Sequence, residues 1–451
     1  MGGSISTLYP AADVISSNPA GLGFAHGFHI TLDWAPPLTI NPAGIFGIEN
    51  RINDQLVESA ANNNPPIDPI TGKTDPESVV DKARVNADLS MRGGLKGGAL
   101  MYGVPYFTIA ASFHQPFRFA TEMNVSGIEF LASSLDDQGK DSIRMFGTIN
   151  GNLNLNFNIA TSSIGFGTRV LPNLSIGMVY DNFNGDLNFE GTFLPEGIIS
   201  SAGGETKSFN SPASIEYDSL FAVIKGDWEG NGFRMRWGVG YHPMKNISLD
   251  ATVTLPVTLD LHGPFSMVHN DIRALNLGAG EDEDVIDADI FLEDNLTKTQ
   301  KRITKINGID IEIPGSATFG FSAKWDNYVA SIVYTSYFSQ LGYKFSYQQF
   351  DSLNVKFKEG DIHQGIDLGS AVRLGIGVKP LILGLGVLFA KSFREENIEI
   401  GANPTIADKK NIFIPFFSLG GGIKIGPRFN FDYILNFYNS SFLRFSTSYR
   451  L

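Results

Sequence analysis

The sequence predicts an all-β fold: a transmembrane, antiparallel β-barrel of about fourteen strands whose lumen is plugged by the N-terminal segment. Three observations lead to this prediction. Apolar and polar residues alternate over long runs, no apolar run is long enough for a membrane-crossing helix, and short connections alternate with long ones. We expect residues 1–24 to form the plug and residues 25–451 to form the barrel with long extracellular loops.

The clearest alternation lies between residues 233 and 261. An apolar residue occupies every second position of residues 233–241, opposite Arg234, Arg236 and two glycines, and residues 249–261 repeat the pattern. A period of two is typical of a β-strand. Both runs exceed the common strand of about five or six residues and suit a tilted strand that crosses a bilayer, about nine to eleven residues.

Composition agrees with strands as the membrane-crossing elements. The most apolar run, residues 381–390, is far shorter than the roughly eighteen residues that a membrane helix needs. Any crossing must therefore use strands, each of which gives half of its side chains to lipid. The chain has 49 glycines, 35 phenylalanines and no cysteine. Its net charge of −13, with no basic stripe, argues against nucleic acid as a partner.

The connections between predicted strands alternate in length. The predicted strands are residues 25–35, 95–103, 106–123, 143–170, 174–190, 231–242, 247–262, 311–325, 328–346, 367–379, 381–394, 411–425, 428–438 and 442–451. Tight turns alternate with long polar segments, which are residues 41–94, 124–142, 191–230, 264–310, 347–366 and 395–410. Outer-membrane barrels have short periplasmic turns and longer outer loops. A soluble β-sandwich has no reason to place every long loop at one end.

One strand carries a row of asparagines. Leucine, phenylalanine and isoleucine alternate with asparagine over residues 152–159. A polar row is costly against lipid, so we expect the asparagines to face the lumen.

The N-terminal segment is rich in small residues and carries a turn signal. Asn-Pro followed by small residues favours a turn, and a compact turn could fold into a barrel mouth; a flexible tail is the alternative. The motif consists of Asn18, Pro19, Ala20, Gly21 and Leu22. The chain begins without a charged region or an apolar stretch, so we expect a mature form from which a signal peptide has been removed.

Together these segments resemble the FadL/TodX family of outer-membrane transporters. Residues 18–22 are similar to the family's N-terminal hatch motif, residues 237–263 to its central hairpin, and residues 313–338 to the strand pair that follows. The resemblance implies a bacterial outer-membrane channel that takes up hydrophobic compounds, long-chain fatty acids or hydrocarbons, passively and as a monomer. The implied partners are those hydrophobic molecules and the surrounding lipid and lipopolysaccharide.

The resemblance also implies that cargo leaves sideways through a gap at a kink in the third strand. Pro116 lies in that predicted strand, followed by Phe117 and Phe119. Its missing N–H removes a ladder hydrogen bond; an ordinary bulge is the alternative. Lateral delivery suits such cargo, because each buried CH₂ gains about 0.8 kcal/mol on leaving water and would lose it in the periplasm.

Basic residues inside the barrel bind carboxylates in the fatty-acid transporters of this family. Lys344 lies where one such lysine is expected, and Arg234 and Arg236 share one strand face and could supply a second charge. Paired inward arginines also serve to neutralise luminal carboxylates, for which Asp250 and Asp260 are candidates.

Neither catalysis nor a cofactor is expected. The sequence has no Gly-x-Ser-x-Gly elbow, no HExxH motif and no P-loop, so we predict neither an enzyme nor a metal site. The acidic run within residues 281–294 could bind a divalent cation that bridges to lipopolysaccharide, or it is a solvated loop. The alternative function is a binding or scaffold protein on the same barrel, as in type IX secretion shuttle proteins.

Overall fold

The computed structural model describes most of the barrel wall and part of the N-terminal segment. The described residues are 6–8, 14–40, 84–91, 93–135, 141–201, 206–209, 222–271, 300–350, 353–378, 381–398, 405–407, 411–425, 429–436 and 443–450.

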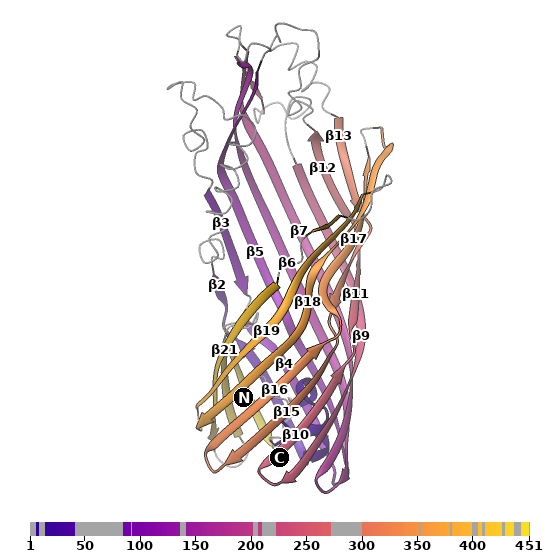
Figure 1. The fold of residues 1–451 in the computed structure, drawn as a ribbon, viewed down its shortest axis with the longest axis vertical. Helices are drawn as coiled ribbons and strands as arrows, with labels where there is room; N and C mark the ends of the chain where they lie inside the picture. The colour runs from indigo at the N-terminus through magenta and orange to yellow at the C-terminus, as the bar shows by residue number, and fades with distance from the viewer. Residues whose placement is uncertain are drawn as a thin grey trace.

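Antiparallel pairing joins the described strands into a sheet that closes on itself (Figure 1). Strand β1 pairs with β4 on one side and with β23 on the other, which completes the circuit. The fourteen strands of the circuit are, in order, β1 (Gly27–Ala35), β4 (Gly94–Gly103), β5 (Phe107–Leu135), β6 (Asp141–Leu171), β7 (Leu174–Ser201), β9 (Ala222–Met244), β10 (Ile247–Thr254), β15 (Ser316–Trp325), β16 (Tyr328–Tyr337), β18 (Lys356–Val378), β19 (Leu381–Ile398), β21 (Asn411–Ile425), β22 (Phe429–Asn436) and β23 (Leu443–Arg450). The predicted all-β antiparallel barrel is confirmed.

Other strands lengthen this wall, and several of them lie in segments predicted to be loops. For example, β3 lies within residues 41–94 and β12 within residues 264–310. The prediction of these whole segments as loops is wrong, because paired strands of the wall continue into them. The additional strands are β2 (Leu38–Ile40), β3 (Arg84–Met91), β8 (Thr206–Phe209), β11 (Val257–His262), β12 (Phe265–Asp271), β13 (Gln300–Ile306), β14 (Gly308–Ile313), β17 (Gln340–Phe350) and β20 (Thr405–Ala407).

The outer face of the wall changes character at one level. On β9, apolar side chains occupy every outward position from Tyr241 up to Phe233, which is 65% exposed. Further up, the same face carries Asn231, Glu229 and Asp227. We call the part with the apolar outer face the lower barrel and the part beyond it the upper barrel. The lower barrel includes the hairpin ends at the bottom of Figure 1.

The inner face changes in the opposite sense. On β10 the buried inward positions include Asp250 and Thr252, whereas on β11 they include Leu259 and Leu261, which are fully buried. Pro256 lies between these two strands and has no N–H for the ladder. At this point the inward-facing positions change from even-numbered residues on β10 to odd-numbered residues on β11. On these strands the lower barrel therefore has an apolar outer face and polar buried side chains inside, and the upper barrel is the reverse.

Apolar side chains from several strands fill the interior of the upper barrel. The buried members of this upper core are Ile159, Phe183, Trp228, Val257, Leu259 and Leu261, and Phe157, Leu187 and Phe189 are among the residues packed against them. The rings of Trp228 and Phe265 stack with centroids 5.5 Å apart. Because Phe157 and Ile159 face inward, Asn152 and Asn154 lie on the outer face, where both are exposed. The expectation that the asparagine row faces the lumen is therefore wrong.

Candidate functional site: the N-terminal segment inside the lower barrel

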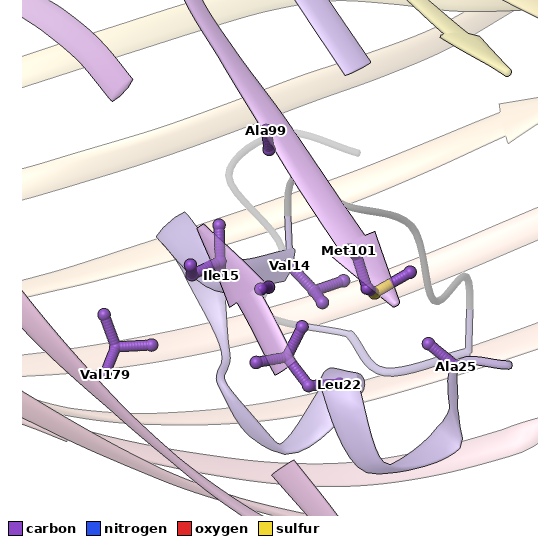
Figure 2. Packing of buried hydrophobic residues seen from close by; sticks show 8 residues of the cluster. Val14, Ile15, Leu22, Ala25, Ala99, Met101 and Val179 are labelled. Atoms are coloured by element: carbon purple, nitrogen blue, oxygen red, sulfur yellow. The ribbon is translucent and has the colours of Figure 1, made fainter. Parts of the chain in front are cut away.

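Two short helices of the N-terminal segment lie inside the lower barrel. They are α1 (Val14–Ser17) and α2 (Ala20–Phe24), and every residue of α2 is buried. Figure 2 shows Ile15 and Leu22 of this segment beside Met101 of β4 and Val179 of β7; these four side chains are fully buried. Neither helix has the length or the apolar character that crossing a membrane would require.

A row of glycines makes room for the segment. Gly167, Gly177 and Gly238 are direct neighbours across β6, β7 and β9. A Cβ atom at Gly177 would collide with the Pro19 carbonyl oxygen, and one at Gly238 would collide with the Asn18 side chain. The predicted Asn-Pro motif therefore lies directly on backbone, a close approach that only glycine permits. Sequence analysis missed this row, although all three glycines occupy inward positions of predicted strands.

Asn18 fixes both the turn and the position of the segment. Its Oδ1 accepts a hydrogen bond from the Ala20 amide at 3.0 Å, the local bond that makes asparagine favourable in turns. Its Nδ2 lies 3.4 Å from Oδ1 of Asp250 on the wall. Thr7 also donates to this Asp250 oxygen, at 2.7 Å, and Ser175 donates to the Ala20 carbonyl oxygen at 2.6 Å.

An ion-pair cluster lies next to the segment. Asp181 is fully buried, and one of its oxygens accepts from Nη2 of Arg236 at 2.6 Å and from Nε of Arg234 at 3.0 Å. Arg236 also donates from Nη1 to the carbonyl oxygens of Ile15, at 3.2 Å, and Ser16. One carboxylate thus serves two guanidinium groups, and Arg236 joins the wall to the N-terminal segment.

Neither of the two carboxylates expected to neutralise the arginines pairs with them. Their partner is Asp181, which the sequence did not single out. Asp250 is bonded instead to the N-terminal segment, and Asp260 faces outward, 2.7 Å from His262. The contact between Asp181 and Arg236 spans 55 residues of sequence, and strand pairing alone brings the two together.

Several transporters of known structure have a similar fold. The toluene transporter TodX of Pseudomonas putida is 14% identical, with a TM-score of 0.48, and the match covers 100% of this chain and 95% of TodX. The toluene transporter TbuX of Ralstonia pickettii is 13% identical, with a TM-score of 0.47 and coverage of 100% and 96%. A FadL homologue of Pseudomonas aeruginosa is 11% identical, with a TM-score of 0.44 and coverage of 99% and 96%.

The chain is similar to FadL/TodX proteins. This is the family that the sequence resembles. A scan of protein-family models and a search of curated proteins gave no match.

Of the three basic residues predicted to bind a ligand, Lys344 lies apart from Arg234 and Arg236. Lys344 pairs with Asp310 of β14 and with His363 of β18, in a row of the upper barrel. Arg234 and Arg236 lie in the lower barrel, on β9. The structure therefore brings the two arginines together and leaves Lys344 in a different part of the wall, where its side chain is exposed.

The wall is irregular where the FadL/TodX resemblance implies a lateral opening. The β5–β6 register shifts between His114 and Phe117, so Pro116 lies at a bulge. On the other side of β5, pairing with β4 ends at His114 and pairing with β3 begins at Phe119. Among the described pairings, residues 115–118 have no partner on that side. The side chains of Pro116, Phe117 and Phe119 lie outside the described part of the structure.

The acidic run of residues 281–294, expected to be either a cation-binding or a solvated loop, lies outside the described residues. Within the described ranges, no group of three or more histidine, aspartate or glutamate side chains is arranged to hold a metal ion.

Proposed function

We propose that this chain is a bacterial outer-membrane channel for the passive uptake of hydrophobic compounds, such as long-chain fatty acids or hydrocarbons. The observation that carries the proposal is the exchange of faces along the wall. The apolar outer face of the lower barrel suits lipid, and the upper barrel encloses apolar side chains behind a water-exposed outer face. A hydrophobic molecule entering from outside would find its first apolar surroundings there.

The lower end of the upper core lies level with the bulge in β5. Ile159 of this core pairs directly with Phe117, one residue after Pro116. Ile159 pairs with Gly185 on its other side, two residues from Phe183 of the core, and the adjacent Asn182 pairs with Phe233 at the top of the apolar outer face. An opening at the bulge would therefore connect the apolar interior with the bilayer at the depth where the hydrocarbon begins. Lateral release would keep the cargo out of water.

The N-terminal segment supports lateral rather than axial release. Below the upper core, the lumen holds the two helices, which are fixed by Arg236 and Asp250. In this proposal residues 1–24 act as a hatch that blocks direct passage to the periplasm. Binding and release then require rearrangement of packed side chains but no energy source.

Uptake by intact cells tests the proposal. Cells without their own hydrophobic-compound channel would express the full chain, a variant lacking residues 2–22, or Pro116→Thr, and accumulation of a labelled fatty acid and of toluene would be measured. We expect uptake with the full chain, altered uptake with the deletion and slower uptake with Pro116→Thr. Uptake equal to that of cells without the protein would refute the channel.

The burial of the upper core favours a second candidate, a binding or scaffold protein like the type IX shuttle proteins. Leu259 and Leu261 are fully buried by protein alone, so this core can also serve as a structural seal. Titration of purified protein with a fatty acid distinguishes the two candidates, because Trp228 of the core should respond only if cargo enters it. A change in Trp228 fluorescence supports the channel, and its absence supports the scaffold.

A further inference from the structure

The asparagine row lines a cavity on the outer face of the upper barrel that transport does not use. The cavity has a volume of about 290 Å³ and is open to solvent. Its lining residues are Ala120, Thr121, Glu122, Asn154, Leu155, Asn156, Asn188 and Glu190, from β5, β6 and β7. This volume is close to the lower end of the roughly 300–1,000 Å³ typical of small-molecule sites. It suits one compact ligand group.

Strand pairing sets the polar groups of the cavity in two adjacent rows. Glu122, Asn154 and Glu190 are direct neighbours across β5, β6 and β7. The next row on this face contains Asn156 and Asn188. Paired strands lie about 4.8 Å apart and successive residues on one face about 6.7 Å apart, so the groups form a flat grid. The grid matches the dimensions of a molecule with several hydroxyl groups around a ring.

The chemistry of the grid favours hydroxyl groups over charged groups. A carboxamide both donates and accepts hydrogen bonds, and a carboxylate accepts them, which matches neighbouring hydroxyls that do both. Among the described residues, no side-chain hydrogen bond is found for Asn154, Asn156 or Glu190. The two glutamates disfavour an anionic group such as a phosphate, and the lining includes no basic residue.

The height of the cavity indicates which molecule can reach it. Asn188 pairs with Asp227, which is six residues from Phe233 at the top of the apolar outer face (233 minus 227). Six residues span about 20 Å along the strand and roughly 15 Å along the membrane normal at the usual tilt. The polar headgroup region of a bilayer is about 5–8 Å thick on each side. The cavity therefore lies beyond phospholipid headgroups, where the sugars of an outer-leaflet glycolipid would be its neighbours.

We propose that this cavity binds a neutral sugar unit of the lipopolysaccharide around the barrel. Asn154 and Asn156 bind the ring hydroxyls, and Glu122 and Glu190 accept hydrogen bonds at its two sides. The inference rests on the outer-membrane placement proposed above but not on the passage of cargo. The site would fix the rotation of the barrel relative to its lipid shell.

Binding of defined glycolipids by the full chain in detergent tests the site. The probes are lipopolysaccharide with its core sugars, called the sugar-bearing form, and lipid A without core sugars, each titrated in the presence and absence of EDTA. The variant is Asn154→Ala/Asn156→Ala, and the matched control is Asn231→Ala, on the outer face of β9 and outside the cavity. Loss of the hydrogen bonds of both asparagines should weaken binding of the sugar-bearing form about tenfold. Lipid A binding and the control should not change.

Three results would overturn the proposal. They are equal binding of lipid A and the sugar-bearing form, unchanged binding by the double variant, and binding that EDTA abolishes equally for both probes, which would identify cation-bridged phosphates instead. If the full chain binds the sugar-bearing form normally but takes up no hydrophobic compound, the channel proposal is refuted and the proposal of a sugar site is not. Because the two asparagines are on the outer face, unchanged hydrocarbon uptake by the double variant would show that the barrel is folded.

Discussion

Asp181 and Arg236 form a buried ion pair 2.6 Å long, and the same guanidinium donates to the Ile15 carbonyl oxygen at 3.2 Å. The wall and the N-terminal segment therefore share one charged group. Taking such charges out of water is costly, and the cost is offset only while all partners are in place. Arg234 adds a second contact to the carboxylate and lies over the Phe183 ring, 4.8 Å from its centroid.

Asp181→Asn should destabilise the barrel strongly. The substitution leaves the buried guanidinium of Arg236 and the partly buried one of Arg234 without their counter-charge, and breaking a buried pair in this way costs about 3–5 kcal/mol. Denaturant unfolding in lipid vesicles measures the change in the free energy of unfolding. The control is Asp227→Asn on the outer face of the upper barrel, which should change it by less than about 0.5 kcal/mol. Equal effects of the two substitutions would contradict this role of Asp181.

Arg236→Gln should release the N-terminal segment while it spares the barrel. Asp181 keeps Arg234 as its partner, so the loss of stability should be smaller than with Asp181→Asn. The donors to Ile15 and Ser16 are lost, so the amides of residues 14–25 should exchange hydrogen faster, as mass spectrometry can measure. Unchanged exchange in this segment would show that its other contacts suffice to hold it.

Gly177→Ala should lower the stability of the barrel only when the N-terminal segment is present. The added methyl group meets the Pro19 carbonyl oxygen, and overpacking of this kind costs about 1–3 kcal/mol. In a variant lacking residues 2–22 the obstacle is gone, so the same substitution should be nearly neutral. The comparison is a double-mutant cycle read from unfolding midpoints. An equal loss of stability in the full chain and in the variant lacking residues 2–22 would mean that the added methyl group strains the sheet itself.

Much of the wall could be predicted from alternation alone. The alternation over residues 233–241 correctly separates inward Arg234 and Arg236 from outward Phe233 and Trp237. The asparagine row shows the limit of this reasoning. A period of two says that two faces differ, but it does not say which one is inside, and the answer reverses between the lower and the upper barrel.

The contacts of the site were harder to predict, because they depend on register between distant strands. Asp181 meets the arginines only because β7 and β9 pair as they do. The glycine row across β6, β7 and β9 likewise appears only when three strands are aligned. The Asn-Pro turn was predictable because its signal is local: Asn18 binds the amide of Ala20, two residues later.

The exchange of faces predicts unequal tolerance of charge along one side of the wall. Val253 of β10 and Thr258 of β11 both occupy exposed outward positions, the first in the lower barrel and the second in the upper. Val253→Lys should cost about 2–4 kcal/mol if the residue lies near the bilayer midplane. Thr258→Lys should cost little, because its side chain would lie in water. Folding yields into vesicles compare the two, and equal yields would mean that the lipid does not end between them.

Two tryptophans on β9 report the same boundary by fluorescence. Trp228 is 3% exposed in the upper core, whereas Trp237 is 38% exposed on the outer face of the lower barrel. Single-tryptophan proteins, with the other three tryptophans replaced by phenylalanine, would be reconstituted into vesicles of brominated lipid. Bromine quenches only by close approach, so Trp237 should be quenched and Trp228 should not. Acrylamide in the water should quench neither strongly, since one residue is covered by protein and the other by lipid. Quenching of Trp228 by brominated lipid would place the upper core within the bilayer and refute the assignment of the upper barrel to the outside.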